Sequence, residues 1–233
     1  MSKGAVRTIL LVHGAYVDGS SWRRVIPLLE AAGFTAVAVQ NPLLSLDEDV
    51  DAVKRALDIA EGPVLLVAHS WGGAVITEAG DDPRVAGLVY VAAGAPDAGQ
   101  SFAEMGKDYP SESSRANVRQ TDPAGFVSLS REGMIHYFAP DLPDSETRVM
   151  AVTQIPVAAS AFATKLTNAA WTAKPSWYAI AGDDKMISPD LQRALVQKIG
   201  ATSITLPTSH VPMLSRPAEV AAFIVEAARG SAQ

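Results

Sequence analysis

Short apolar runs alternate along the chain with longer segments in which apolar residues recur at helical spacing. Such runs are typical of strands, and the first two have the composition of strands buried on both faces of a parallel sheet. The alternation predicts an α/β fold with a doubly wound, mostly parallel sheet of about six strands and helices on both faces. The predicted strands cover residues 6–12, 34–39, 64–68, 85–92, 176–181 and 203–206.

The segments between these strands carry helix signals. Residues 20–21 offer an N-cap for a helix that stops at Gly33, and Pro27 inside it predicts a kink or a later start. The acidic residues 47–49 suit the first turn of a helix over 46–60. Further helices are predicted over 189–199 and from Pro217 onwards.

The alternation stops near Gly94 and resumes near residue 173. Residues 95–172 contain short mixed segments interrupted by prolines, and they show no strand–helix rhythm. We therefore predict that 95–172 form an insertion, a cap or mobile lid made mainly of short helices. The core then consists of residues 1–94 and 173–233.

Composition narrows the classes of protein. Hydrophobic residues make up 48% and charged residues 19% of the 233 positions, which suits a globular chain with a sizeable core. The net charge of −6 and the lack of a basic cluster argue against a nucleic-acid partner. The absence of cysteine excludes thiol nucleophiles and Cys-ligated metals, and the four histidines lack metal-ligand spacing, so no metal is expected.

Targeting signals are also missing from the sequence. No apolar run approaches the roughly 20 residues that span a membrane. The start, Met1-Ser2-Lys3-Gly4, leads into a strand rather than into the apolar core of a signal peptide. We therefore expect a cytoplasmic protein with no membrane partner.

The segment at 64–74, VLLVAHSWGGA, carries the strongest chemical signal. Ser70 follows a buried strand and precedes small residues that can start a helix packed tightly on the sheet. This is the context of a nucleophile elbow, in which a serine sits on a strained strand-to-helix turn with its hydroxyl exposed. Ala68 stands at the usual first glycine of the elbow and still provides a small side chain. An ordinary turn with a serine N-cap is the alternative.

A nucleophilic serine needs a base. His210 follows Ser70 in the chain and lies in the exit loop of the strand at 203–206, so it is the candidate base. A solvated loop histidine is the alternative reading. His69 is adjacent to the serine and should point away from its hydroxyl, whereas His136 falls in the insertion and is expected in cap packing or pocket lining.

The base in turn needs an acid that orients it. Asp183 and Asp184 both follow the strand at 176–181. We favour Asp184, which stands in the phrase Gly-x-Asp-x-x-Ile-x-Pro, and keep Asp183 as the alternative. Both carboxylates can also simply cap the helix that starts near Pro189.

Four motifs in this order make the chain resemble the α/β-hydrolase superfamily. Within it, the chain is similar to the small-cap branch that holds methylesterases, hydroxynitrile lyases and bacterial esterase-like proteins. The resemblance covers nearly the whole chain and implies the order serine, acid, histidine. The motifs are Leu10–Ala15 with Trp22 downstream, the Ser70 segment, the Asp184 phrase and Ser209–Ser215.

The resemblance also implies further site residues. It places the oxyanion hole at the backbone N–H groups of Ala15 and Trp71. Gly14 and Val211 stand where lyases of this branch carry threonine or asparagine and a lysine, so the resemblance implies ester hydrolysis rather than cyanohydrin cleavage. The alternative is that a lysine of the insertion, such as Lys107 or Lys165, supplies the missing positive charge. Gly14 and Val211 are both candidate substrate contacts. Candidate pocket aromatics from the insertion are Tyr109, His136, Tyr137, Phe138, Phe162 and Trp171, and a core role is the alternative for each.

These observations predict a serine hydrolase that cleaves a small or medium carboxylic ester through an acyl-enzyme, with no cofactor. The partner is then a small-molecule ester. Two alternatives keep the same scaffold: a ligand-binding protein that retains the triad, and a hydroxynitrile lyase or perhydrolase. The sequence leaves the acyl and alcohol groups open, and it also leaves open a lactone or a small amide as the substrate. It also leaves open the oligomeric state, for which a homodimer is the commonest assembly.

Overall fold

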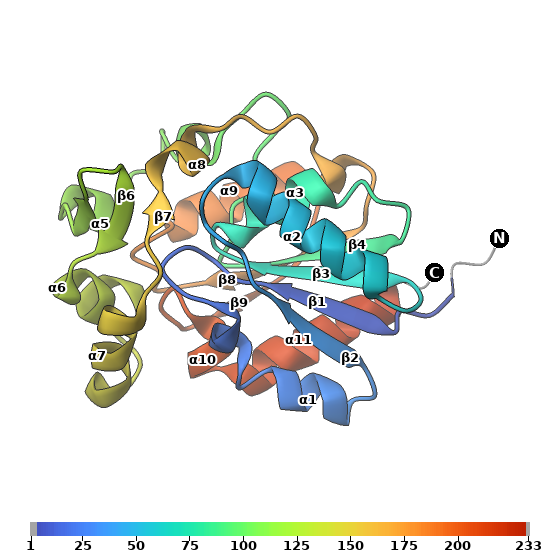
Figure 1. Cartoon of the computed structure of the whole chain (residues 1–233). Helices are drawn as coiled ribbons and strands as arrows, with labels where there is room; N and C mark the ends of the chain where they lie inside the picture. Colours follow the sequence, from blue (N-terminus) through green and yellow to red (C-terminus); the bar gives the residue numbers. More distant parts are fainter. Residues whose placement is uncertain (1–3, 232–233) are drawn as a thin grey trace.

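The computed structural model describes residues 4–231 (Figure 1). Residues 1–3, on which part of the signal-peptide argument rests, and residues 232–233 of the predicted core lie outside the described residues. Within 4–231, six parallel strands form one sheet in the order β2-β1-β3-β4-β8-β9, which confirms the predicted fold class. The strands are β1 (Thr8–Val12), β2 (Thr35–Val39), β3 (Val64–His69), β4 (Val85–Val91), β8 (Ser176–Ala181) and β9 (Thr202–Leu206).

The strand order explains which strands are buried. The four central strands, β1, β3, β4 and β8, are buried along their whole length, as their apolar composition predicts. The strand at 34–39, predicted as buried, is instead the edge strand β2, and only Val39 of its five residues is buried. Strand β9 forms the other edge and buries only Leu206. Composition alone does not distinguish an edge strand from a central one, because the difference lies in which strands pair.

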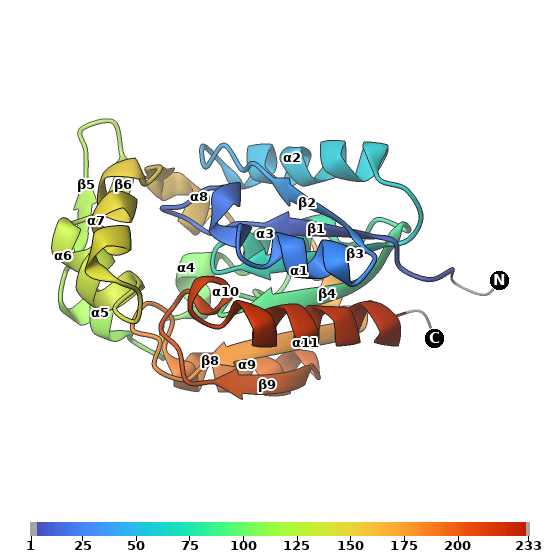
Figure 2. The ribbon, with the colours of Figure 1, turned by 90° about the horizontal axis from the view of Figure 1, so that it is seen from below.

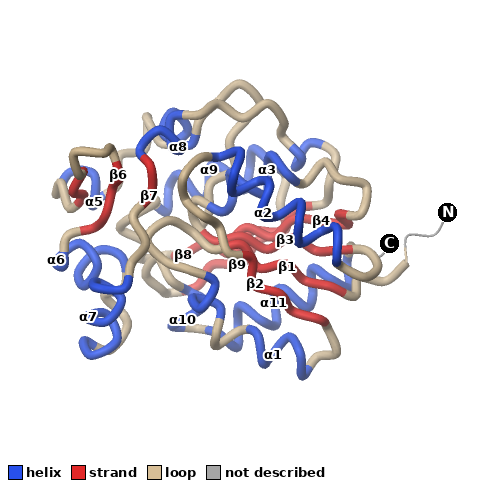
Figure 3. The backbone as a smooth tube through the Cα atoms, viewed as in Figure 1, coloured by secondary structure: helices blue, strands red, loops and turns tan. Residues whose placement is uncertain are grey.

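Helices cover both faces of the sheet (Figures 1 and 3). Figure 1 shows α2, α3 and α9 on one face and α1 and α11 on the other, which is the arrangement that right-handed crossovers produce. None of the helices in residues 4–231 combines the length and the apolar character that crossing a bilayer takes. The core helices are α1 (Ile26–Ala31), α2 (Leu46–Ile59), α3 (Gly72–Ala79), α9 (Pro189–Ile199), α10 (Pro212–Ser215) and α11 (Pro217–Gly230).

Local sequence sets where these helices begin. Residues 19–22 form a short 3₁₀ turn, and α1 starts only at Ile26 with Pro27 in its first turn, where a missing N–H costs nothing. The later start is one of the two outcomes that Pro27 predicts. Helix α2 begins after Ser45, whose hydroxyl accepts a hydrogen bond from the Glu48 N–H at 3.1 Å. Helix α9 keeps its predicted bounds and ends at Gly200, which has a left-handed φ of 63°.

Elements α4 to α8, which come between β4 and β8 in the chain, lie beyond the carboxyl ends of the central strands (Figure 2). Residues 167–174 then return beside α3, where Thr167 contacts Glu78 and Lys174 contacts Val85 at the start of β4. The chain between β4 and β8 contains short helices, as predicted, but also a three-stranded antiparallel sheet in the order β5-β6-β7 that the sequence did not predict. Two of these strands have at most three residues, too few to show a period. The elements are α4 (Phe102–Met105), α5 (Glu112–Arg115), β5 (Arg119–Thr121), β6 (Phe126–Leu129), α6 (Arg131–Gly133), α7 (Asp144–Thr153), β7 (Val157–Ala158) and α8 (Ala159–Ala163).

Candidate active site

Parallel strands bring the four sequence motifs to one edge of the sheet. The loops after β1, β3, β8 and β9 all leave from the carboxyl ends of their strands, so they meet at this edge. These loops carry Ala15, Ser70, Asp184 and His210, respectively. Residues up to 195 positions apart in the chain (Ala15 and His210) thus line one cavity.

Ser70 occupies a strained turn between β3 and α3. Its φ is +53°, a conformation that side chains other than glycine rarely adopt. The turn stays tight because α3 packs directly against the sheet: a Cβ on Gly72 would lie 2.7 Å from the Val12 carbonyl oxygen, and one on Gly73 would overlap the Gly94 carbonyl oxygen. Ser70 is 7% exposed and lines the cavity. The structure thus has the local geometry of a nucleophile elbow.

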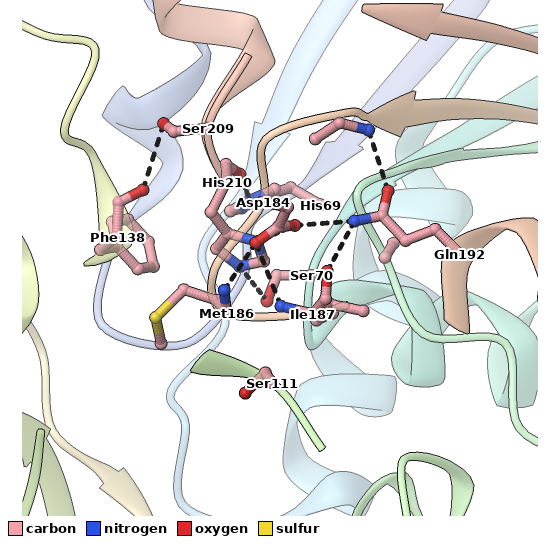
Figure 4. A network of polar contacts seen from close by, with 12 residues as sticks. His69, Ser70, Ser111, Phe138, Asp184, Met186, Ile187, Gln192, Ser209 and His210 are labelled. Atoms are coloured by element: carbon pink, nitrogen blue, oxygen red, sulfur yellow. Dashed lines mark hydrogen bonds and ion pairs between the residues drawn. The ribbon is translucent and has the colours of Figure 1, made fainter. Parts of the chain in front are cut away.

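His210 lies within hydrogen-bond distance of the serine (Figure 4). The Ser70 Oγ and the His210 Nε2 are 2.8 Å apart, and both residues are buried. The preceding residue, Ser209, anchors the loop by donating its backbone N–H to Asp141 Oδ2 at 2.8 Å. His69 donates its Nε2–H to the His210 carbonyl oxygen at 2.7 Å, so it supports the loop rather than contacting the serine hydroxyl.

Asp184, and not Asp183, contacts the histidine. The His210 Nδ1–H donates to Asp184 Oδ2 at 2.7 Å. The other oxygen, Oδ1, accepts from the backbone N–H groups of Met186 at 2.7 Å and Ile187 at 3.0 Å. Asp184 is 4% exposed whereas Asp183 is exposed to solvent. The hydrogen bonds to Oδ1 fix the carboxylate, so its second oxygen is held toward the imidazole.

Gln192 on α9 is a further contact that the sequence analysis missed. Its Nε2 donates to Asp184 Oδ2 at 2.8 Å and to the Ile187 carbonyl at 2.9 Å, while its Oε1 accepts from the Ala181 N–H. The amide is fully buried with all these partners satisfied. The available signal was a polar residue on the apolar face of the helix at 189–199, eight positions after Asp184.

The two expected oxyanion donors both line the cavity. Ala15 follows the end of β1, and Trp71 follows the serine directly. Within residues 4–231, no hydrogen bond from either backbone N–H to another group of the chain is found. Donors that the protein itself does not use are what an oxyanion hole requires.

The Trp71 side chain does more than pack beside the elbow. Its Nε1–H donates to Asp49 Oδ2 at 2.7 Å, and its ring makes edge contacts with Phe102 and Phe162 at centroid distances of 5.5 and 5.3 Å. Asp49 lies in the first turn of α2, as predicted, and is in addition fully buried, where it also accepts from the Leu43 N–H at 2.8 Å. Burial raises the pKa of the Asp49 carboxyl to about 6, against the opposing effect of these hydrogen bonds.

The cavity has a volume of about 390 Å³ and a mostly apolar wall. Of the expected substrate contacts, Tyr109 and Phe162 line it. Its apolar wall is completed by Phe102, Met105, Met186, Ile187 and Leu191.

Three expected contacts lie outside the lining of this cavity. Gly14 lies behind the serine, where a Cβ would be 2.7 Å from the Ser70 Cβ. Val211 is fully buried in the core, and the Tyr137 ring is half-buried with Lys185 Nζ 5.7 Å from its centroid. The structure places these three residues off the cavity wall because adjacent residues in a loop point in different directions, which the sequence does not reveal.

The remaining candidate aromatics also lie outside the lining. His136 is exposed, Phe138 is buried with its ring 5.1 Å from that of His210, and Trp171 donates its Nε1–H to the Pro96 carbonyl at 2.9 Å. In the part of the chain that the structure describes, no three His, Asp or Glu side chains are grouped as metal ligands.

Comparisons with known proteins show the family to which the chain belongs. The model of the Alpha/beta hydrolase family matches residues 9–223. The chain is 28% identical to Methylesterase 7 of Arabidopsis thaliana over 98% of both chains, and 27% identical to a pyrethroid hydrolase of Sphingobium wenxiniae over 98% of this chain and 90% of that protein. A crystal structure of a pyrethroid hydrolase superposes with a TM-score of 0.84 at 24% identity, covering 98% of this chain and 99% of the other. The family match spans the strand that precedes the elbow, the elbow itself and the histidine loop, and the chain therefore belongs to the alpha/beta hydrolase family.

Proposed function

We propose that this α/β hydrolase cleaves small or medium carboxylic esters through an acyl-enzyme. The observation that carries the proposal is the continuous hydrogen-bonded series from Ser70 through His210 to Asp184, which opens onto an apolar cavity of about 390 Å³. The similarity to a protein named methylesterase supports the same class of substrate.

Each group has a defined role in the proposed reaction. The Ser70 hydroxyl attacks the ester carbonyl while His210 Nε2, 2.8 Å away, accepts its proton. The negative charge that forms on the carbonyl oxygen is stabilised by the N–H groups of Ala15 and Trp71. His210 then donates the proton to the departing alcohol, and a water molecule activated by the same nitrogen releases the acid.

Asp184 acts on the base rather than on the substrate. Because it accepts the Nδ1–H of His210, the free electron pair of the imidazole stays on Nε2, facing the serine. Its charge also stabilises the imidazolium that forms during the attack. Three further hydrogen bonds, from Met186, Ile187 and Gln192, keep the carboxylate in place.

We also propose that residues 95–172 form a cap over the serine, on a core made of 1–94 and 173–233. Support comes from the cavity, whose wall combines Ser70 and His210 with residues of α4, α5 and α8, including Phe102, Ser114 and Phe162. A cap in this place would select esters by the shape and charge of their acyl and alcohol groups.

The test is hydrolysis of p-nitrophenyl esters of increasing acyl length. We expect turnover by the wild type and loss of turnover in Ser70→Ala, with Ser145→Ala as a matched control because Ser145 is an exposed serine on α7 away from the cavity. Equal turnover by wild type and Ser70→Ala would refute the proposal. Folding of each variant is checked by circular dichroism.

A further inference from the structure

The charged side chains that line the cavity are all cationic. Lys107 and Arg119 lie on its wall, whereas no Asp or Glu of residues 4–231 does. The chain as a whole has the opposite balance, with 25 acidic and 19 basic residues. The ionised side chains on the cavity wall therefore have the opposite sign to the net charge of the chain.

Neither cation is neutralised by the protein itself. Among the described residues, no carboxylate lies within ion-pair distance of Lys107 or Arg119. By contrast, Lys165, from the same part of the chain but outside the cavity wall, pairs with Glu104 at 3.5 Å. The two cavity cations are thus free to bind a negative group on a ligand.

Tyr16 adds a neutral hydrogen-bond donor beside Arg119. It follows the oxyanion donor Ala15, lines the cavity and is 4% exposed. Its hydroxyl is buried and makes no hydrogen bond of normal geometry within residues 4–231, but it lies close enough to the Arg119 side chain to interact with it. Burial raises the pKa of the Tyr16 hydroxyl, and the nearby charge of Arg119 partly opposes the rise, so the hydroxyl remains a donor at neutral pH.

The polar groups share the cavity with a large apolar wall. Phe102, Met105, Phe162 and Leu191 provide that wall, while Arg119, Tyr16 and Lys107 provide donors. A ligand that matches both has an apolar chain and one anionic end. A carboxylate suits this end because its two oxygens can accept from a planar guanidinium and from a hydroxyl together.

We propose that the preferred substrates are half-esters of dicarboxylic acids, with the free carboxylate bound by Arg119 and Tyr16 and the ester held at Ser70. This inference rests on the proposed function, since it names the substrate class of the same site. Water adds across the acyl–oxygen bond, so each half-ester yields one alcohol and one dicarboxylic acid. Lys107 contributes a second positive charge at the cavity wall and strengthens the preference for an anion.

The experiment compares each charged ester with a neutral analogue of the same shape. Monomethyl succinate, glutarate, adipate and pimelate are each paired with the methyl ester whose free acid is replaced by a primary amide. Methanol release gives kcat/KM for both members of a pair. We expect the charged member to be preferred by about tenfold or more at the best chain length, which is the range of charge-assisted hydrogen bonds. The ratio should fall with added NaCl, because Arg119 is exposed enough to be screened.

Two arginine variants test the assignment. Arg119→Gln should lower the charged-to-neutral ratio by about tenfold. Arg115→Gln is the matched control, since Arg115 is an exposed arginine of α5 that does not line the cavity, and it should leave the ratio unchanged. Tyr16→Phe should lower the ratio less than Arg119→Gln, because it removes a neutral donor only.

Binding without turnover provides an independent readout. Calorimetry measures the affinity of monomethyl adipate for Ser70→Ala and for Ser70→Ala combined with Arg119→Gln, and we expect the double variant to bind about tenfold more weakly. A wild-type ratio near one at every chain length, or equal effects of the two arginine variants, would overturn the inference. If neutral esters are then still hydrolysed in a Ser70-dependent way, the inference fails and ester hydrolysis stands. If no ester is hydrolysed but Arg119 still controls adipate half-ester binding, ester hydrolysis fails and the anion site stands.

Discussion

Replacing Asp49 by asparagine should change how the stability of the protein depends on pH. Asp49 is fully buried, and its oxygens accept hydrogen bonds from the Trp71 Nε1–H and the Leu43 N–H. No cation is paired with it among the described residues. Its ionised form is therefore stabilised only by two neutral donors, which do not fully offset the loss of hydration.

The magnitude follows from the pKa in the two states. Burial raises the pKa of the Asp49 carboxyl from 3.8 to about 6. Each pH unit by which the folded pKa exceeds the unfolded pKa corresponds to about 1.4 kcal/mol of stability. The rise from 3.8 to about 6 therefore means that ionisation of Asp49 lowers the free energy of unfolding by about 3 kcal/mol. Between pH 4 and pH 6 the folded protein retains the proton that the unfolded chain has lost. The contribution of Asp49 to the free energy of unfolding therefore falls as pH rises through that interval, and it is constant above about pH 7.

The buried histidines act in the opposite direction. Burial lowers the pKa of His13 and His69, so the unfolded chain binds protons that the folded protein does not, and their contribution to stability rises with pH. Wild-type stability alone thus mixes the two effects. The difference between Asp49→Asn and wild type isolates Asp49, because both proteins contain the same histidines.

The assay is urea unfolding at a series of pH values from 4 to 8. Asparagine offers one acceptor oxygen to two donors. The substitution should therefore lower the free energy of unfolding by about 1–3 kcal/mol at every pH. Relative to wild type, the free energy of unfolding of the variant should then rise by about 2 kcal/mol between pH 4 and pH 7, because part of the full effect falls below pH 4. Asp51→Asn, which removes an exposed carboxylate of the same helix, should give a flat difference. A flat or falling difference curve for Asp49→Asn would refute the argument that Asp49 is buried as an uncompensated charge.

The remaining predictions concern the chemistry. Ser70→Ala and His210→Ala should each abolish ester turnover and leave the circular dichroism spectrum unchanged. When catalytic groups act as a unit, removal of any one of them abolishes nearly all of the rate enhancement that the unit provides. Asp184→Asn should lower kcat by orders of magnitude, but by less than Ser70→Ala or His210→Ala does. Asp183→Asn should have little effect on kcat. If Asp183→Asn lowered kcat strongly and Asp184→Asn did not, the assignment of Asp184 as the acid would be wrong. Mandelonitrile should release no cyanide beyond the uncatalysed rate, since Gly14 and Val211 lack the hydroxyl or amide and the positive charge that lyases of the resembled branch carry at these two positions. Ser70-dependent cyanide release faster than hydrolysis of every ester would contradict this and would indicate that Lys107 on the cavity wall supplies the charge.

Local sequence was enough for the parts of the protein that depend on neighbouring residues. Apolar runs identify the central strands, Pro27 indicates the late start of α1, and the small residues after Ser70 identify the tight turn. The order of the serine, acid and histidine motifs along the chain, together with the rule that parallel strands present their carboxyl ends to one edge, indicates which residues meet. The structure brings these residues together, and the geometry distinguishes Asp184 from Asp183.

Only the tertiary structure determined the features that depend on contacts between distant segments. Edge and central strands share a composition, so the exposure of β2 follows from its pairing and not from its residues. The Asp49–Trp71 hydrogen bond joins α2 to the elbow, and Gln192 reaches Asp184 from α9. The sequence also does not predict the small sheet between β4 and β8, because strands of two to four residues are too short to show an alternation of apolar and polar residues. Local patterns encode the direction and burial of a backbone segment, whereas the partner of each polar side chain is set by how the segments pack.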